Sequence, residues 1–156
     1  MKSRNADRRT GTAELRAKRP RHILFLCVAN SARSQMAEGI ARSLAPKGLK
    51  ISSAGSSPAS VRPEAIQVLN EIGIDISGHR SKGLESIDVG SVDTVITLCG
   101  EEVCPVFPGK VHRVHWGLPD PAGSTGTEEA RMNAFRSVRD ELLRRLKALF
   151  DHGEER

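Results

Sequence analysis

The sequence lacks the features that mark several classes of protein. Its 156 residues include only three cysteines and no tyrosine, and aromatic residues make up 3%. No apolar run approaches the roughly 20 residues of a membrane-spanning helix, and the amino terminus lacks the apolar stretch of a secretory signal. Three cysteines in a chain of this length also argue against a secreted fold held by disulfides. We therefore expect a cytoplasmic protein without a membrane partner, whose cysteines are buried, bind metal or react.

The overall composition is that of an ordinary globular protein. Hydrophobic residues make up 38% and charged residues 28%, which excludes collagen-like and wholly disordered chains. The length suits one domain with a substantial core. We interpret the chain as a single-domain monomer.

The net charge of +5 originates in the amino terminus. Residues 1–21 carry eight basic and two acidic side chains, a net +6, so the remainder carries −1. We predict a flexible basic arm at 1–21, a folded domain at 22–150 and a polar tail at 151–156. A basic arm could contact nucleic acid or act in organelle targeting, but a solvated extension is the simpler interpretation. Nucleic acid is therefore not an expected partner.

Strand-like and helix-like segments alternate from residue 22 onward. Short apolar runs predict strands at 22–26, 49–52, 92–98 and 111–114. Apolar residues at helical spacing predict helices over 36–44, from Pro63 and after a Thr127 cap. This alternation predicts an α/β fold, a four-stranded parallel sheet flanked by helices on both faces. Ligand sites in such sheets form beyond the carboxyl ends of the strands, where the strand order reverses.

The segment after the first predicted strand has the character of an anion-binding loop. Cys27 and Ser34 bound it, and between them lie Val28, Ala29, Asn30, Ser31, Ala32 and Arg33. Successive N–H groups from 28 to 33 can surround a tetrahedral oxyanion, and the positive end of the following helix reinforces them. Arg33 suits two of the oxygens, and Cys27 suits the role of a thiolate nucleophile. Ser34 can donate a hydrogen bond to that thiolate, and Asn30 tolerates a left-handed backbone.

Three further residues follow later strands. Cys99 and Cys104 come after the third predicted strand, and Asp120 comes after the fourth. Because the carboxyl ends of parallel strands share one sheet edge, Cys27, Cys99 and Asp120 are expected to lie together. Each also has a structural explanation, since free cysteine is a common core residue and aspartate before proline is common in turns. A zinc site is not expected, because no nearby Cys or His pair completes a tetrahedron.

The stretch Phe25–Gly39 resembles the oxyanion loop of the low-molecular-weight protein tyrosine phosphatase superfamily, and most of all its thioredoxin-coupled arsenate reductases. The similarity covers about residues 22–150 and includes Ser53–Gly55, Thr97–Cys99, Cys104–Pro108 and His115–Pro121.

This resemblance implies a role for each candidate residue. Cys27 attacks arsenate, held by Arg33 and the loop, while Asp120 protonates the departing oxygen. Cys99 then attacks Cys27 and releases arsenite, and Cys104 attacks Cys99 and frees Cys27. Thioredoxin reduces the resulting Cys99–Cys104 disulfide, although the short Cys99–Cys104 spacing leaves glutaredoxin or a small thiol open as the donor.

The sequence departs from the family pattern at several positions. Ala29 stands where many relatives have Gly, and Ala32 where some have a cysteine outside the relay. Some relatives bind potassium through residues matching Asn30, Glu38 and Ser53 and through an acidic residue, whose region here contains Arg80 and Lys82. We expect no potassium and no other cofactor, with the Lys82 ammonium in the electrostatic role of the ion.

Two other functions remain open at this point. The first is hydrolysis of phosphomonoesters through a Cys27 phosphoenzyme, with Cys99 and Cys104 structural; the absence of tyrosine, including at Ala122 after Asp120-Pro121, disfavours it. The second is a non-catalytic anion or nucleic-acid binder that acts through the basic arm. Removal of residues 1–20 would abolish such binding but leave an activity of Cys27 intact.

Overall fold

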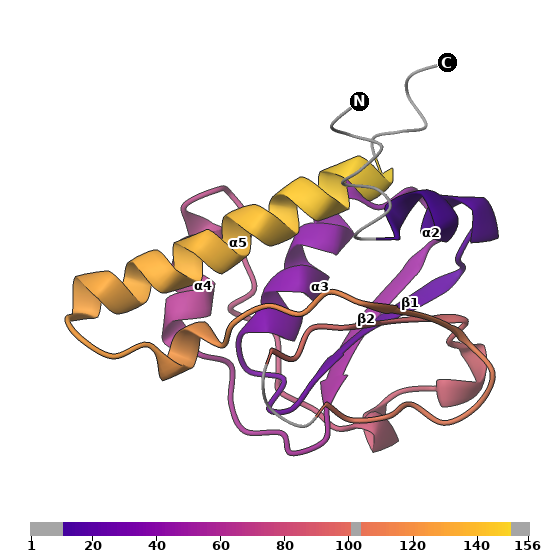
Figure 1. The fold of residues 1–156 in the computed structure, drawn as a ribbon, viewed down its shortest axis with the longest axis horizontal. Helices are drawn as coiled ribbons and strands as arrows, with labels where there is room; N and C mark the ends of the chain where they lie inside the picture. The colour runs from indigo at the N-terminus through magenta and orange to yellow at the C-terminus, as the bar shows by residue number, and fades with distance from the viewer. Residues whose placement is uncertain (1–10, 101–103, 151–156) are drawn as a thin grey trace.

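Four parallel strands form the centre of the computed structural model, which describes residues 11–100 and 104–150. The sheet order is β2-β1-β3-β4. The strands are β1 (His22–Cys27), β2 (Lys50–Gly55), β3 (Thr94–Thr97) and β4 (His112–His115). The α-helices are α2 (Thr12–Lys18), α3 (Arg33–Leu44), α4 (Pro63–Asn70) and α5 (Glu128–Phe150), and the 3-10 helices are η1 (Leu84–Ser86), η2 (Val89–Ser91) and η3 (Pro121–Gly123). The predicted α/β fold with a four-stranded parallel sheet is confirmed (Figure 1).

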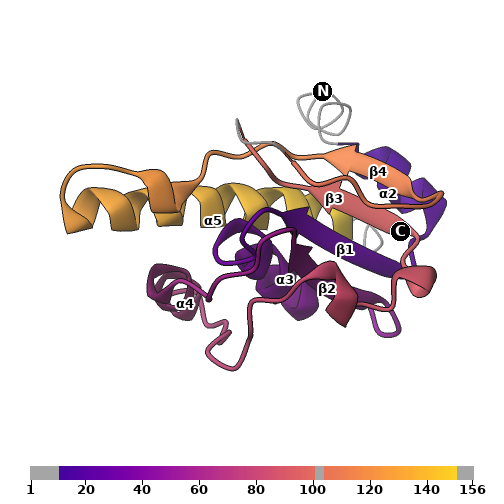
Figure 2. The same cartoon turned by 90° about the horizontal axis from the view of Figure 1, so that it is seen from below.

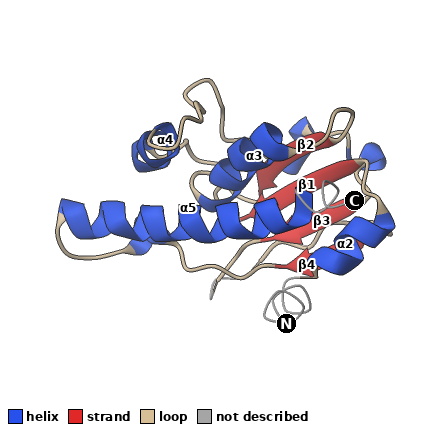
Figure 3. Ribbon diagram, turned by 90° about the horizontal axis from the view of Figure 1, so that it is seen from above, coloured by secondary structure: helices blue, strands red, loops and turns tan. Residues whose placement is uncertain are grey.

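Strand β1 is buried on both faces and organises two hydrophobic clusters. Ile23 and Phe25 belong to the larger cluster, to which α3, α4 and α5 contribute (Figure 3). Leu24 and Leu26 point to the opposite face and pack with Phe107 and with residues around η1. Both faces are therefore covered, as the run of apolar residues predicts. On the second face the cover is made of 3-10 helices and loops rather than α-helices (Figure 2).

The helix boundaries follow local signals in the sequence. Pro63 is the first residue of α4, where its missing N–H costs nothing. The Thr127 side chain accepts a hydrogen bond from the Ala130 N–H at 3.0 Å and caps α5, as predicted. Helix α3 begins at Arg33, before the apolar stripe that predicted it, because Arg33, Ser34 and Gln35 are polar but buried.

Strand order reverses at β1, which lies between β2 and β3. From β1 the chain crosses to β2 on one side and later returns to β3 on the other. The crevice at such a reversal is where ligands bind in open α/β sheets. The carboxyl end of β1 is Cys27, and Leu26 pairs with Thr97 of β3. Cys27 therefore lies at the switch point, next to the segment that leads to Cys99.

Helix α2 lies within the segment predicted to be a flexible arm, and the prediction is wrong for Thr12–Lys18. Leu15 is fully buried in the larger cluster, and the Arg16 guanidinium donates a hydrogen bond to the Ala148 carbonyl oxygen of α5 at 2.8 Å. A buried leucine and this hydrogen bond thus dock the short helix on α5. Residues 1–10 of the arm and the predicted tail at 151–156 lie outside the described residues.

None of the helices in the described ranges is long and apolar enough to cross a membrane.

His22 makes the stability of the fold depend on pH. Its side chain is buried, and its two ring nitrogens lie 2.8 Å from the hydroxyl oxygens of Ser91 and Ser52. Burial lowers the pKa of His22 below its ordinary 6.5. The unfolded chain therefore binds a proton that the folded chain does not, so stability is full above about pH 6.5 and declines below it.

We expect the thermal unfolding midpoint to fall between about pH 7 and about pH 5, with a shallower fall in His22→Gln. Differential scanning calorimetry across this range measures both proteins. Burial also lowers the pKa of His79, so part of the slope persists in the variant. An identical slope in the two proteins would contradict this role of His22.

Candidate functional site

The loop between β1 and α3 curls with its carbonyl groups outward. The carbonyl oxygens of Cys27, Val28, Ala29 and Ser31 accept hydrogen bonds from the N–H groups of Ser56, Ser57, Ala59 and Arg62, at 2.8–3.3 Å. In a trans peptide unit the N–H of the following residue points the opposite way from the carbonyl. The N–H groups of residues 28, 29, 30 and 32 are therefore directed toward the inside of the loop, the arrangement that an oxyanion requires.

Asn30 is the buried centre of this loop. Its φ of 51° is in the left-handed region, which asparagine tolerates, and its side chain is fully buried. The amide nitrogen donates to the Ser34 hydroxyl at 2.7 Å and to the Ser53 hydroxyl at 2.9 Å. The amide oxygen accepts from Gln35 Nε2 at 2.8 Å and from the Lys82 N–H at 2.9 Å. Three segments of the chain, namely α3, β2 and the segment around Lys82, are thereby tied to one side chain.

Cys27 lies at the floor of the loop as a free and nearly inaccessible thiol. Its sulfur is 3.2 Å from the Ser34 hydroxyl oxygen. Because Ser34 already accepts a hydrogen bond from Asn30, its own hydrogen is available to the sulfur. Ser34 thus offers a hydrogen-bond donor to this sulfur, which lies at the floor of a loop whose N–H groups point inward.

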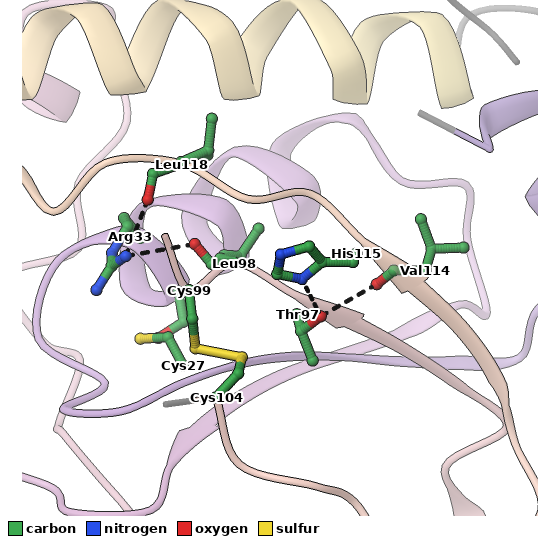
Figure 4. The surroundings of a disulfide bond; sticks show 10 residues. Cys27, Arg33, Thr97, Leu98, Cys99, Cys104, Val114, His115 and Leu118 are labelled. Carbon is green, nitrogen blue, oxygen red and sulfur yellow. Dashed lines mark hydrogen bonds between the residues drawn. A yellow bond between two sulfur atoms is a disulfide. The ribbon is translucent and has the colours of Figure 1, made fainter. Parts of the chain in front are cut away.

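Arg33 is buried at the start of α3 and joins two other segments to the loop. Its Nη1 donates to the carbonyl oxygen of Leu118 at 3.0 Å and lies 3.4 Å from that of Leu98 (Figure 4). Leu98 directly precedes Cys99, and Leu118 lies two residues before Asp120. These two carbonyls fix the orientation of the Arg33 guanidinium, the group that we predict to bind an oxyanion.

A pocket of about 240 Å³ opens at this point, and the predicted residues line it. Its walls are formed by Cys27, Val28, Ala29, Ser31, Ala32, Arg33 and Asp120. The Asp120 carboxylate also accepts a hydrogen bond from the Ala122 N–H at 3.0 Å, which holds it at the start of η3. The structure thus brings Asp120 to the same cavity as the loop, although the two are far apart in the sequence.

Cys99 and Cys104 are joined by a disulfide, with Cα atoms 5.5 Å apart. Cys99 is fully buried, whereas Cys104 is half-buried. Figure 4 shows the three cysteine side chains gathered in one place, beside Arg33. Residues 101–103 between the paired cysteines lie outside the described residues.

Some contributors to the site were not singled out from the sequence. Gln35 holds Asn30, and its Oε1 lies 3.0 Å from Nδ1 of His79. A β-carbon on Gly55 would meet the Val28 carbonyl oxygen at 2.3 Å, so only glycine admits the loop at this distance. Ser53-Ala-Gly55 formed part of the resemblance, but its steric reason becomes visible only when β2 and the loop are side by side.

A free cysteine at the floor of a loop whose N–H groups point inward, at the switch point of a parallel sheet, is the arrangement expected of enzymes that attack tetrahedral oxyanions through a thiol. The chain belongs to the low molecular weight phosphotyrosine protein phosphatase family, whose model matches residues 22–155.

Relatives within this family share most of the chain's length. The arsenate reductase of Bacillus subtilis (strain 168) is 43% identical over 134 residues, which cover 85% of this chain and 96% of the relative. The solved structure of the arsenate reductase from Archaeoglobus fulgidus DSM 4304 aligns with a TM-score of 0.71 at 28% identity, over 83% of this chain and 99% of that one. A thioredoxin-dependent arsenate reductase of Corynebacterium glutamicum aligns with a TM-score of 0.55 at 31% identity, over 81% of this chain and 61% of that one.

The close approach of Gly55 to the loop predicts a strong effect of one methyl group. Gly55→Ala is expected to displace the loop, abolish binding of inorganic phosphate and lower the free energy of unfolding by about 1–3 kcal/mol. Isothermal titration calorimetry and chemical denaturation measure the two effects. Gly78→Ala is the matched control, because a β-carbon there meets no atom within 4 Å. Phosphate binding by Gly55→Ala at the wild-type affinity would refute the steric argument.

Proposed function

We propose that the protein reduces arsenate to arsenite through a relay of its three cysteines and is regenerated by thioredoxin. The observation that carries the proposal is the Cys99–Cys104 disulfide beside a free Cys27 in an oxyanion pocket. A phosphatase needs one thiol, because water releases the phosphoryl group. A reductase must supply two electrons, which this pair of cysteines can store. The arsenate reductases among the relatives agree with this function.

The first step is attack of the Cys27 thiolate on arsenic. The loop N–H groups and Arg33 bind the arsenate oxygens and neutralise their charge. Asp120 lines the same pocket and gives its proton to one oxygen, which leaves as water. The product is a covalent bond between the Cys27 sulfur and arsenic, which is still in the As(V) state.

The next two steps move electrons through sulfur. The Cys99 thiolate attacks the Cys27 sulfur, the sulfur–arsenic bond breaks, and its electron pair stays on arsenic, which leaves as arsenite. Cys104 then attacks Cys99 and restores the Cys27 thiolate, which leaves the Cys99–Cys104 disulfide. The structure corresponds to this last state, since Cys99 and Cys104 are paired and Cys27 is free. Cys99 is buried in the same hydrophobic cluster as Cys27, whereas Cys104 is the more accessible half of the pair.

A dithiol protein such as thioredoxin is the reductant that we favour. Both electrons of the disulfide then leave in one exchange, and a relative of known structure is thioredoxin-dependent. Val106 lies two residues after Cys104 and is 83% exposed, so its apolar side chain is available to a partner that approaches the disulfide. Phe107, which is buried, anchors the segment behind it. We assign Val106 to the contact with the reductant.

The phosphatase alternative accounts for less of the site. It explains the loop, Cys27 and Asp120, but it leaves the Cys99–Cys104 disulfide without a function. The chain also contains no tyrosine.

Two cysteine variants separate the steps of the relay. Reduced Cys104→Ser is expected to form a single arsenite per chain and to stop with a Cys27–Cys99 disulfide, because the thiol that resolves it is gone. Reduced Cys99→Ser is expected to form no arsenite. Acid quenching, arsenite assay and disulfide mapping by mass spectrometry measure both outcomes. Arsenite formation by Cys99→Ser at the wild-type level would eliminate this order of transfer.

Val106→Asp tests the reductant contact. The variant is expected to raise the KM for thioredoxin roughly tenfold while the reduction by dithiothreitol is unchanged, because a buried charge at a contact opposes docking. Val89→Asp is the control, since Val89 is also exposed, at 42%, but precedes the amino end of β3, away from the disulfide. Equal KM values for the two variants would exclude Val106 from the interface.

A further inference from the structure

A buried carboxylate beneath the oxyanion loop has two cationic partners. Glu38 of α3 is 3% exposed, and one of its oxygens pairs with the Arg42 guanidinium at 2.8 Å. The other oxygen, Oε1, accepts a hydrogen bond from the Ser53 hydroxyl and lies 3.4 Å from the Lys82 ammonium. A buried carboxylate without such partners would destabilise the fold, so the positive charge of Lys82 stabilises the ionised form of Glu38.

The Lys82 ammonium is surrounded by oxygens. Glu38 Oε1, Ser53 Oγ and the Arg80 carbonyl oxygen each lie 3.4 Å from Nζ, which has three hydrogens to direct at them. The backbone N–H of Lys82 donates to the Asn30 amide oxygen at 2.9 Å. Lys82 is therefore held at its backbone by Asn30 and at its ammonium group by three oxygens.

The hydrogen-bond directions between Glu38 and Cys27 follow from the charge on Glu38. An ionised carboxylate only accepts, so the Ser53 hydroxyl donates to it and must accept from Asn30. The two hydrogens of the Asn30 amide are then used on Ser53 and Ser34. Ser34 is left to direct its own hydrogen at the Cys27 sulfur, 3.2 Å away. One ordered chain thus links the Lys82–Glu38 pair to the nucleophile.

Potassium, which some family members bind, does not fit these residues. Glu38 and Ser53 would be two of its ligands, but both already contact the Lys82 ammonium. An ion at these oxygens would also lie against the positive charges of Lys82 and Arg42. Like charges in contact with the same carboxylate repel each other strongly in a partly buried site.

We infer that Lys82 is a built-in counter-cation, a positioning residue that orders the Ser53–Asn30–Ser34 chain and so orients the Ser34 hydroxyl on Cys27. It makes the enzyme independent of potassium. Replacement of Lys82 by aspartate adds a carboxylate oxygen beside Glu38 and Ser53 and removes the ammonium charge that opposes a cation there. Lys82→Asp should therefore gain a potassium requirement that the parent protein lacks.

The inference rests on the proposed function for its activity assay, so a second readout avoids arsenate. In the oxidised protein Cys27 is the remaining free thiol, because the chain contains three cysteines and two are joined. Its rate of alkylation by iodoacetamide reports on its surroundings directly. Lys82→Met should slow this alkylation roughly tenfold, Lys82→Arg should retain it, and Lys47→Met, a charge loss on an exposed turn, should leave it unchanged.

The deciding experiment compares single-turnover arsenite formation in sodium chloride and potassium chloride at equal ionic strength. We expect equal rates for the wild type in the two salts. Lys82→Asp should be roughly tenfold slower in sodium and be restored by potassium, while Lys47→Asp should behave as the wild type. Acceleration of the wild type by potassium, or a Lys82→Asp rate that is normal in sodium or not restored by potassium, would overturn the inference.

If Lys82→Asp does not fold, equal alkylation rates for Lys82→Met and Lys82→Arg overturn it instead. A wild type that forms no arsenite contradicts the proposed function alone, and the alkylation rates still decide the role of Lys82.

Discussion

The site depends above all on the four hydrogen bonds of the buried Asn30 side chain. A buried amide that leaves a donor or acceptor unmade is penalised, so each of its partners is constrained in position. Those partners come from α3, β2 and the 79–82 segment. Together with the left-handed backbone at Asn30, they give the loop its curl. The inward direction of the loop N–H groups depends on this satisfied amide, together with the hydrogen bonds that the loop carbonyls accept from residues 56–62.

A second set of contacts couples the loop to the redox cysteines. Arg33 bonds to carbonyls that immediately precede Cys99 and closely precede Asp120. A β-carbon on Gly100 would meet the Leu118 carbonyl oxygen at 2.8 Å, so the segments after β3 and β4 approach each other as closely as glycine permits. The Cys27 loop, the Cys99–Cys104 disulfide and Asp120 are therefore held by one small group of backbone contacts. If one of them moves during thiol exchange, the contacts that it makes with the other two must change.

Much of this arrangement could be predicted from the sequence. The apolar runs and turn signals predict the four strands and three of the helices, and the resemblance of the Cys27 loop predicts the residues that line the pocket. Other features could not be read from local patterns. The segment of α2 has one large apolar residue, Leu15, which is too few to predict a docked helix, and the burial of Leu15 depends on α5. The partners of Arg33 are backbone carbonyls, whose positions have no signature in side-chain sequence.

Reduction of arsenate by three thiols of one chain is the reaction on which the proposed function depends. Fully reduced protein, mixed with one equivalent of arsenate in the absence of any other reductant, tests it most directly. After quenching, arsenite is quantified and the disulfides are mapped by mass spectrometry. We predict a single arsenite per chain, with Cys99 joined to Cys104 and Cys27 free. Three free thiols and no arsenite would contradict the account.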